Sequence, residues 1–235
     1  MKIIALESSA VTASVAVTED EKLLAQSFQN SGLTHSATLM PMVADLLKNT
    51  GLTLDEMDVV AVAAGPGSFT GVRIGVAAAK GLAWPGDKPC APCSTLESMA
   101  WQCAHVGGEI CAAMDARRNQ VYCARFWAEN GELKRLTNDR AMGLDELGSE
   151  IRASGKLQTL VGDGAHLVQK ALEEAGLPCA PMPPHLVYQT AWGVARCALR
   201  MAQEGKLVSA AAMAPSYHRL SQAERERLER LGKTE

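Results

Sequence analysis

The sequence predicts an α/β protein of two similar halves, each with the element order βββαβα. Two observations carry this prediction. An apolar strand that ends in an acidic residue opens each half, at Ile3–Glu7 and at Ile110–Asp115. In both halves a polar turn and two further strands follow, and then a helix, a strand and a second helix. Short runs of apolar or alternating residues predict the strands, and apolar residues spaced by three or four predict the helices.

The elements of the first half are separated by recognisable turns. Alternation of apolar and polar residues predicts its second and third strands, with Glu19 and Asp20 in the turn between them. A continuous apolar run predicts a buried fourth strand, and a glycine-rich loop precedes the second helix. In order, the expected elements are the strands Ile3–Glu7, Ala13–Thr18 and Lys22–Phe28, the helix Thr34–Asn49, the strand Val59–Ala63 and the helix Thr70–Ala83.

The second half repeats this plan with different residues. Polar turns at Ala116–Asn119 and Glu129–Gly131 separate its first three strands. In order, the expected elements are the strands Ile110–Asp115, Val121–Phe126 and Glu132–Leu136, the helix Leu144–Ala153, the strand Gln158–Val161, the helix Ala165–Ala175 and a further helix Thr190–Glu204. Two βββαβα halves that face one another are typical of the actin-like, ribonuclease-H-like superfamily of ATPases and sugar kinases.

Length and composition agree with two domains of a soluble protein. The 235 residues suit one large domain or two of about 110 residues each. We expect an N-terminal domain over residues 1–104, a C-terminal domain over residues 105–215, and a charged tail over residues 216–235 in which glutamates alternate with arginines. The net charge of −3 and the pI of about 6.0 give the chain no basic footprint for binding nucleic acid by itself.

The chain is expected to be cytoplasmic and not to enter a membrane. The apolar run at the N-terminus ends at Glu7, too early for a signal peptide, and no stretch approaches the roughly 18 apolar residues that span a bilayer. Seven cysteines in mostly apolar surroundings suit reduced thiols. Cys90 and Cys93 match a C-x-x-C pattern, but no second pair stands at zinc spacing, so we expect no metal there.

The loop of glycines and proline before the second helix is the most informative stretch of the chain. Its residues are Gly65, Pro66, Gly67, Ser68, Phe69 and Thr70. The helix behind it carries Gly71, Gly75, Ala79 and Ala83 at four-residue steps, which makes one flat ridge without large side chains. Glycine in a helix costs about 1 kcal/mol relative to alanine, so close packing must compensate. Either the ridge packs on its own sheet, or a partner helix docks on it.

The helix Thr34–Asn49 carries two apolar stripes. One contains Leu39, Met42 or Val43, and Leu46, and the other contains Met40, Val43 and Leu47. A helix that covers a single sheet needs one such stripe. Two stripes therefore predict burial on two sides, either against a partner or between the domains of this chain.

Catalytic chemistry is poorly supported by the sequence. In nucleotide-binding actin-like proteins the first hairpin turn binds phosphate through backbone amides and glycines. Here the turn Glu7, Ser8 and Ser9 keeps an acid and hydroxyls but has no glycine, so we expect a vestigial phosphate turn and no tight ATP binding by the chain alone. Gly162-Asp-Gly164 is a candidate second phosphate loop.

Five scattered histidines form no metal-binding pair and no nucleophile–base set, so no catalytic or metal-ligating residue is predicted. Asp115 and Arg117 are expected to form a turn-stabilising ion pair.

Five motifs run over nearly the whole chain: Ile4–Ser9, Gly65–Gly75, Ser94–Leu96, Asp115–Arg117 and Pro215–Arg219. With these motifs the chain resembles the TsaB (YeaZ) family of bacterial tRNA threonylcarbamoyladenosine biosynthesis proteins. The resemblance implies a two-domain actin-like fold and a subunit that does not transfer the threonylcarbamoyl group. The catalytic sibling TsaD carries a metal-binding His-x-x-x-His. Thr95 and Met99 stand at those places here, and neither can replace a neutral imidazole as a ligand.

The resemblance also implies partners and a pathway. The family supports modification of the adenosine next to the anticodon in tRNAs that read codons starting with A. Its members pair with TsaD through two helices of the N-terminal domain, the ATPase TsaE joins them, and a homodimer can form when TsaD is absent. Contact with tRNA is expected to be indirect, and ATP and Mg²⁺ are expected only at the level of the complex. The expected partner interface comprises His35, Leu39, Met42, Val43, Leu46, Gly71, Val72, Arg73, Gly75, Val76 and Ala79.

This interface gives two expectations about variants. Leucine at Gly75 or Ala79 should weaken TsaD binding and leave the fold largely intact, and Arg73 is expected to pair with an acid across the interface. The alternatives are an independent metallopeptidase or an ATP-dependent small-molecule kinase. Each needs a metal pair, an activated nucleophile or a working phosphate hairpin, and turnover of ATP or a peptide by the purified protein distinguishes them.

Overall fold

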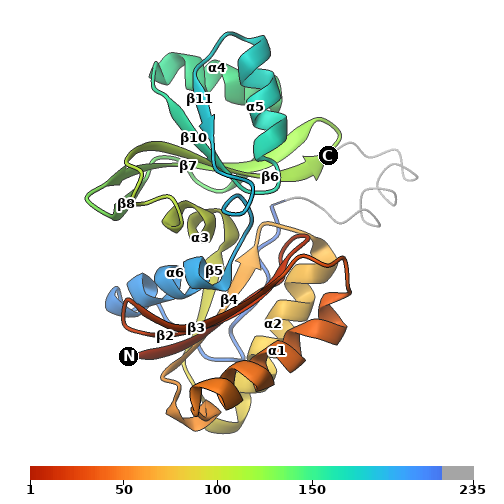
Figure 1. The fold of residues 1–235 in the computed structure, drawn as a ribbon, viewed down its shortest axis with the longest axis vertical. Coiled ribbons are helices and arrows are strands. Elements are labelled where there is room, and N and C mark those ends of the chain that lie inside the picture. Colours follow the sequence, from red (N-terminus) through yellow and green to blue (C-terminus); the bar gives the residue numbers. More distant parts are fainter. Residues whose placement is uncertain (219–235) are drawn as a thin grey trace.

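A computed structural model of the protein describes residues 1–218. The predicted charged tail beyond residue 218 lies outside the described residues. The described chain contains two sheets, each flanked by helices, one above the other in Figure 1. The predicted α/β plan with βββαβα in each half is confirmed, and the structure adds strands and a helix that the sequence pattern did not predict.

The first sheet has the strand order β3-β2-β1-β4-β5. Strands β1, β2 and β3 pair antiparallel, whereas β4 and β5 run parallel to β1. The strands are β1 Lys2–Glu7, β2 Ala13–Glu19, β3 Lys22–Gln29, β4 Val59–Gly65 and β5 Cys90–Ser94. The central strands β1 and β4 are buried on both faces, which fits their continuous apolar sequences.

The second sheet has the order β11-β10-β6-β7-β8, with β9 paired to β7. Its strands are β6 Gly108–Arg117, β7 Gln120–Glu129, β8 Glu132–Arg135, β9 Arg140–Gly143, β10 Gln158–Val161 and β11 Cys179–Pro181. As in the first sheet, an antiparallel group (β6, β7, β8) continues into parallel strands (β10, β11) on the other side of the first strand. The two halves therefore share their topology as well as their element order.

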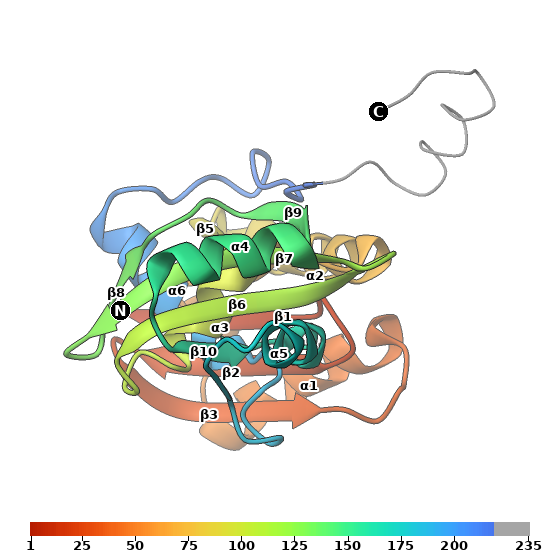
Figure 2. The same cartoon turned by 90° about the horizontal axis from the view of Figure 1, so that it is seen from above.

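Helices cover both faces of both sheets (Figures 1 and 2). α1 and α2 pack on the outer face of the first sheet, α4 and α5 pack on the outer face of the second, and α3 and α6 lie between the sheets. The helices are α1 His35–Thr50, α2 Phe69–Ala83, α3 Thr95–Trp101, α4 Leu144–Ser154, α5 Ala165–Glu174 and α6 Ala191–Gln203, with short 3₁₀ turns at Leu54–Glu56 and Trp84–Gly86. Although α6 follows the second sheet in the chain, it packs on β1, β2, β4 and β5 of the first.

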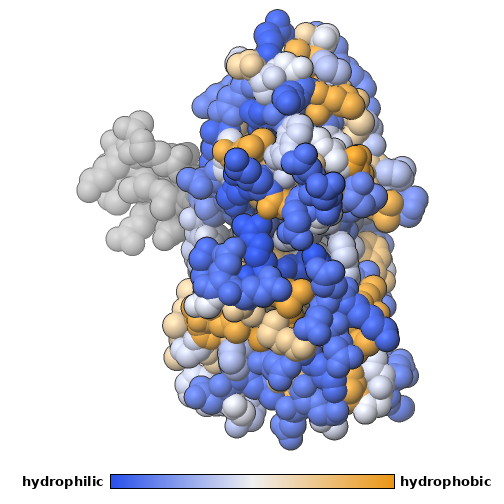
Figure 3. Space-filling view, turned by 90° about the vertical axis from the view of Figure 1, so that its left-hand side faces the viewer, coloured by the Kyte–Doolittle hydropathy of each residue, from blue (hydrophilic) through white to orange (hydrophobic). Residues whose placement is uncertain are grey.

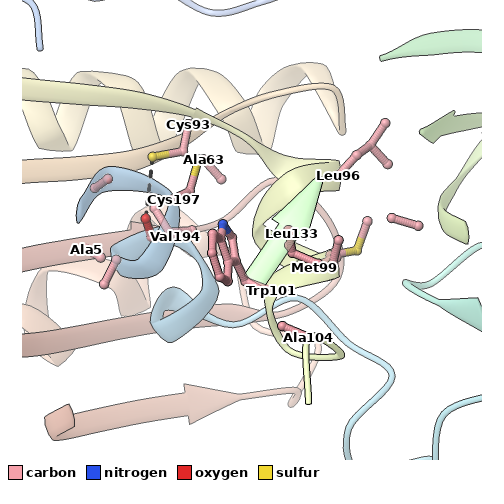
Figure 4. Close-up of a cluster of buried hydrophobic side chains, with 14 of the residues drawn as sticks. Ala5, Ala63, Cys93, Leu96, Met99, Trp101, Ala104, Leu133, Val194 and Cys197 are labelled. Carbon is pink, nitrogen blue, oxygen red and sulfur yellow. Dashed lines mark hydrogen bonds between the residues drawn. The ribbon is translucent and has the colours of Figure 1, made fainter. Parts of the chain in front are cut away.

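The layer between the sheets is a continuous hydrophobic core (Figure 4). Met99 and Trp101 of α3 and Cys197 of α6 are buried there between strands of the two sheets. The thiol of Cys93 on β5 donates to the carbonyl oxygen of Val194 on α6 at 3.5 Å. This shared core joins the two halves.

The chain after α6 returns to the first sheet. We call residues 205–218 the C-terminal strap. Val208 forms an antiparallel bridge with Cys90 at the β5 edge. Met213 is fully buried in the core that the first sheet forms with α1 and α2. The Ser216 amide donates to the carbonyl of Ala64 at 2.7 Å. The strap thus covers the β5 edge and ends beside the glycine-rich loop.

On the face shown in Figure 3, hydrophobic residues are scattered among hydrophilic ones. Within residues 1–218, no helix combines the length and the apolar character needed to cross a membrane.

Candidate functional site

The glycine-rich loop packs directly on the first hairpin turn. The Ser68 amide donates to the carbonyl of Ser9 at 2.6 Å, and the Ser8 hydroxyl donates to the carbonyl of Gly71 at 2.9 Å. His35, at the start of α1, contacts the carbonyl oxygen of Ala10 through its Nε2 at 2.7 Å. The predicted motif loop and the predicted phosphate turn are therefore brought together, and α1 is tied to the same turn.

Close packing explains the glycines of this region. A Cβ on Gly65 would collide with the carbonyl oxygen of Ser216, and the φ of +126° at Gly65 is itself unfavourable for other residues. A Cβ on Gly67 would lie 2.9 Å from the Cβ of Ser9. The loop can approach the turn and the strap only because these positions have no side chain.

The small-residue ridge of α2 faces its own sheet. A Cβ on Gly71 would collide with the carbonyl oxygen of Ser8, and one on Gly75 would lie 2.5 Å from the Oγ of Ser8 and 3.2 Å from Val62 Cγ2. Ala79 is fully buried on the same side. Of the two interpretations of the ridge, the structure supports packing on the sheet.

Most side chains expected at the partner interface are therefore inside the fold. They belong to the core between the first sheet and helices α1 and α2: Leu39, Met42, Val43, Leu46, Val72, Val76 and Ala79. The expectation that these residues form a docking surface is corrected, because they are at most 8% exposed. Periodicity had identified the apolar face of each helix correctly, but that face covers the sheet.

The opposite side of α1 and α2 is exposed and carries small or apolar residues. The two helices pack side by side (Figure 1). We call this surface the outer face, and it comprises Ala37, Met40, Pro41 and Ala44 of α1 and Arg73, Ala77, Gly81 and Trp84 at the end of α2. Trp84 is 68% exposed and Met40 is 42% exposed. Arg73, a predicted interface residue, lies on this face. Met40, from the second apolar stripe of α1, lies there too.

A ring cluster stands at the N-terminal end of the outer face. Phe69 of α2 and Tyr217 of the strap are stacked, with ring centroids 4.4 Å apart. The guanidinium of Arg73 lies 3.9 Å from the centroid of Phe69, and its Nε donates to the Tyr217 hydroxyl at 2.8 Å. Sequence reasoning missed Tyr217 as a site residue, although it lies within the Pro215–Arg219 motif.

A cleft of about 720 Å³ opens between the halves beside this cluster. Its walls come from the first hairpin turn, the glycine-rich loop and the strap on one side, and from the end of β6 and the loop before α5 on the other. Asp115, Arg117, Asp163 and His166 line the second wall. Asp115 pairs with Arg117 at 3.7 Å, so the predicted ion pair is present.

The first phosphate turn is filled by the chain's own carboxylate. The amide of Ser9 donates to Glu7 Oε1 at 2.5 Å, so the amide that a phosphate would need is already used. Glu7 is fully buried, and burial raises its pKa to about 7, against the opposing effect of hydrogen bonds from Ser9. The nearby Asp163 carboxylate also contributes to this increase, and the value of about 7 already includes its effect.

The candidate second phosphate loop is also internally bonded. The amide of Gly162 donates to the carbonyl of Val187 at 2.7 Å, and that of Gly164 donates to the carbonyl of Ala113 at 3.0 Å. Burial raises the pKa of Asp163, whose carboxylate accepts a hydrogen bond from the side-chain amide of Gln189 at 2.7 Å. The backbone amides of Ser9, Gly162 and Gly164 therefore already have acceptors within the fold.

Thr95 and Met99, which the family resemblance sets against the two histidines of the catalytic sibling, are part of the core. Thr95 and Met99 on α3 are fully buried, and the Met99 sulfur packs where a Cβ on Gly162 would fall. Within residues 1–218 no group of three or more histidine, cysteine, aspartate or glutamate side chains is arranged to hold a metal ion. The seven cysteines are free thiols, and Cys90 and Cys93 are buried on β5.

Known proteins resemble this chain in sequence and in fold. A family model described as TsaD, tRNA N6-adenosine threonylcarbamoyltransferase, matches residues 23–226. The tRNA threonylcarbamoyladenosine biosynthesis protein TsaB of Bacillus subtilis is 32% identical over 174 residues, which cover 74% of this chain and 76% of that protein. TsaB of Escherichia coli is 38% identical over 134 residues, covering 56% and 58%. YeaZ from Pseudomonas aeruginosa, a solved structure, superposes with a TM-score of 0.79 at 25% identity, over 92% of this chain and 99% of that chain.

The duplicated fold and the family model define an actin-like protein related to the threonylcarbamoyltransferase TsaD, and the predicted fold class is confirmed. Within that class the chain belongs to the TsaB (YeaZ) family.

Proposed function

We propose that this chain is a non-catalytic subunit required for threonylcarbamoylation of the adenosine next to the anticodon in tRNAs that read codons starting with A. Its task is to bind and support the catalytic subunit TsaD, together with TsaE. The family membership supports the pathway, because the relatives are tRNA threonylcarbamoyladenosine biosynthesis proteins. Action in the cytoplasm follows from this proposal.

The observation that carries the proposal is the outer face of α1 and α2. Ala37, Ala44, Ala77 and Gly81 leave the backbones of both helices accessible, and Met40 and Trp84 add large apolar side chains. Small residues let a partner helix approach closely along the helix ridges, and flexible methionines suit an apolar interface. We propose that two helices of TsaD dock here and form a helical bundle, and that a second copy of this chain occupies the same face when TsaD is absent.

The polar groups of the cleft support a non-catalytic role. Amides that would hold phosphate donate to Glu7 and to backbone carbonyls, and Thr95 and Met99 are built into the core. We therefore assign ATP and Mg²⁺ to the complex with TsaD and TsaE, and direct recognition of tRNA to the partners. The charge of −3 agrees with indirect contact to tRNA.

Reconstitution tests the proposal. Purified TsaD and TsaE from the same organism are supplied with tRNA and the substrates of threonylcarbamoylation, with and without this chain, and the modified nucleoside is quantified. Formation should depend on this chain and should saturate near one copy per TsaD. Equal rates without it would overturn the proposed function.

A further inference from the structure

Arg73 is held in one orientation from two sides. Phe69 precedes it by one helical turn and provides a ring face 3.9 Å from the guanidinium carbon. Tyr217 comes from the C-terminal strap, far along the chain, and its hydroxyl accepts the Nε–H at 2.8 Å. Tyr217 is itself fixed because its ring stacks on Phe69 and because the neighbouring Ser216 amide is bonded to Ala64.

The two terminal nitrogens of the Arg73 guanidinium form no ion pair within the described chain. Arg73 Nε bonds Tyr217, and no carboxylate lies within ion-pair distance of Arg73 among residues 1–218. Most other arginines among residues 1–218 have carboxylate partners, namely Arg117, Arg125, Arg135, Arg140, Arg196 and Arg200, whereas Arg118 and Arg152 form no such pair. Arg73 thus presents a pre-oriented, exposed cation with two terminal nitrogens at the end of the outer face.

We propose that Arg73 anchors the outer face to a carboxylate side chain of the protein partner, and that the strap residue Tyr217 positions it. This inference rests on the proposed function, which supplies the partner. A guanidinium fork binds a carboxylate through two parallel hydrogen bonds, and a fork that is already oriented loses less entropy on binding. A protein carboxylate is favoured over an RNA phosphate because Arg73 lies in one exposed row with Ala77, Gly81 and Trp84, none of which is charged, and because the chain carries no net positive charge.

Calorimetric titration of TsaD from the same organism into variants tests the inference. Arg73→Gln should weaken binding about 10- to 100-fold, the range for a hydrogen-bonded charged group. Arg73→Lys keeps the charge but not the fork and should weaken binding about tenfold. Tyr217→Phe keeps the stacked ring and loses the hydroxyl, so it should weaken binding of TsaD about threefold. Tyr217→Ala also loses the ring and should weaken binding about tenfold. Arg152→Gln on α4 removes the same charge at the far end of the molecule and should bind like the wild type.

A double variant separates positioning from a purely structural role. If Tyr217 acts through Arg73, Tyr217→Ala should have no further effect on affinity in the Arg73→Gln background. An equal loss in both backgrounds would overturn the positioning role. Circular dichroism confirms that each variant is folded.

The outcomes also distinguish this inference from the proposed function. If the wild type binds TsaD and Arg73→Gln binds within twofold of it, the anchor is overturned while the docking face stands. If the wild type does not bind at all, both fail. If Arg73→Gln lowers the affinity of the assembled complex for tRNA but not the affinity for TsaD, the ligand of Arg73 is a phosphate and the carboxylate assignment is overturned.

Discussion

Gly75 of α2 lies directly against Ser8 of the first hairpin turn: a Cβ on Gly75 would come within 2.5 Å of the Ser8 hydroxyl oxygen. This contact sets how close α2 can lie to the sheet. It also reverses the expectation drawn from the sequence that leucine at Gly75 would leave the fold intact. Bulk at this position pushes α2 off β4 and off the turn.

We therefore expect Gly75→Ala to lower the free energy of unfolding by about 1–3 kcal/mol, as overpacked sites do. Gly81→Ala is the matched control in the same helix, because nothing lies within 4 Å of its Cβ position. That variant should be more stable than the wild type by about 0.5–1 kcal/mol, the helix-propensity difference. Urea unfolding measures both, and a Gly75→Ala protein as stable as Gly81→Ala would contradict the packing described.

The sequence pattern predicted the repeated plan because its strands are apolar or alternating runs and its long helices have apolar residues spaced by three or four. It missed the short strands β5, β9 and β11 and the short helix α3, which are too short to show such a pattern. It could not tell which way the ridge of Gly71, Gly75 and Ala79 faces, since periodicity shows that residues share a face but not what covers that face. The strap was missed for a different reason. Its contacts through Val208 and Met213 are single, long-range ones that leave no periodic trace.

The strap should be an integral part of the first half. Met213 is fully buried in the core that the first sheet forms with α1 and α2, so Met213→Ala should lower the free energy of unfolding by about 2–5 kcal/mol. Met40→Ala is the matched control, because Met40 is 42% exposed and surface substitutions change stability by about 0.5 kcal/mol or less. Thermal and urea unfolding compare the two variants. Equal stabilities would show that the strap does not contribute to the core.

Glu7 should make stability depend on pH near neutrality. Its pKa is about 7 in the folded chain against 4.5 ordinarily, so the folded state holds a proton that the unfolded state has released between these values. Stability from this group is therefore greatest below pH 4.5, falls as pH rises towards 7 and is constant above. Across this pH range the free energy of unfolding should fall by about 3 kcal/mol in total because of Glu7.

Glu7→Gln removes the titration and leaves an amide oxygen that can accept from Ser9. The difference in unfolding free energy between this variant and the wild type should grow in favour of the variant from pH 5 to pH 8. Urea unfolding across this range measures it. A difference that does not change with pH would contradict a buried, titrating Glu7.

The isolated chain should not bind ATP tightly. The amides of Ser9, Gly162 and Gly164 already have acceptors within the fold, and breaking such bonds offsets what a phosphate would gain. Calorimetry with ATP and Mg²⁺ should give a Kd weaker than about 1 mM. The TsaD complex in the same buffer is the control, and saturable micromolar binding by the isolated chain would contradict the account of both loops.

The most direct test of the central claim is the binding of TsaD to the outer face of α1 and α2. Ala77→Arg places a large side chain in the middle of that face at a position where arginine favours a helix. Ala153→Arg makes the same change on the exposed side of α4. Calorimetric titration of TsaD should give saturable binding near one to one for the wild type and for Ala153→Arg, and at least about a hundredfold loss for Ala77→Arg, as expected for a central interface position. Wild-type affinity in a folded Ala77→Arg protein would contradict the claim that this face carries the partner.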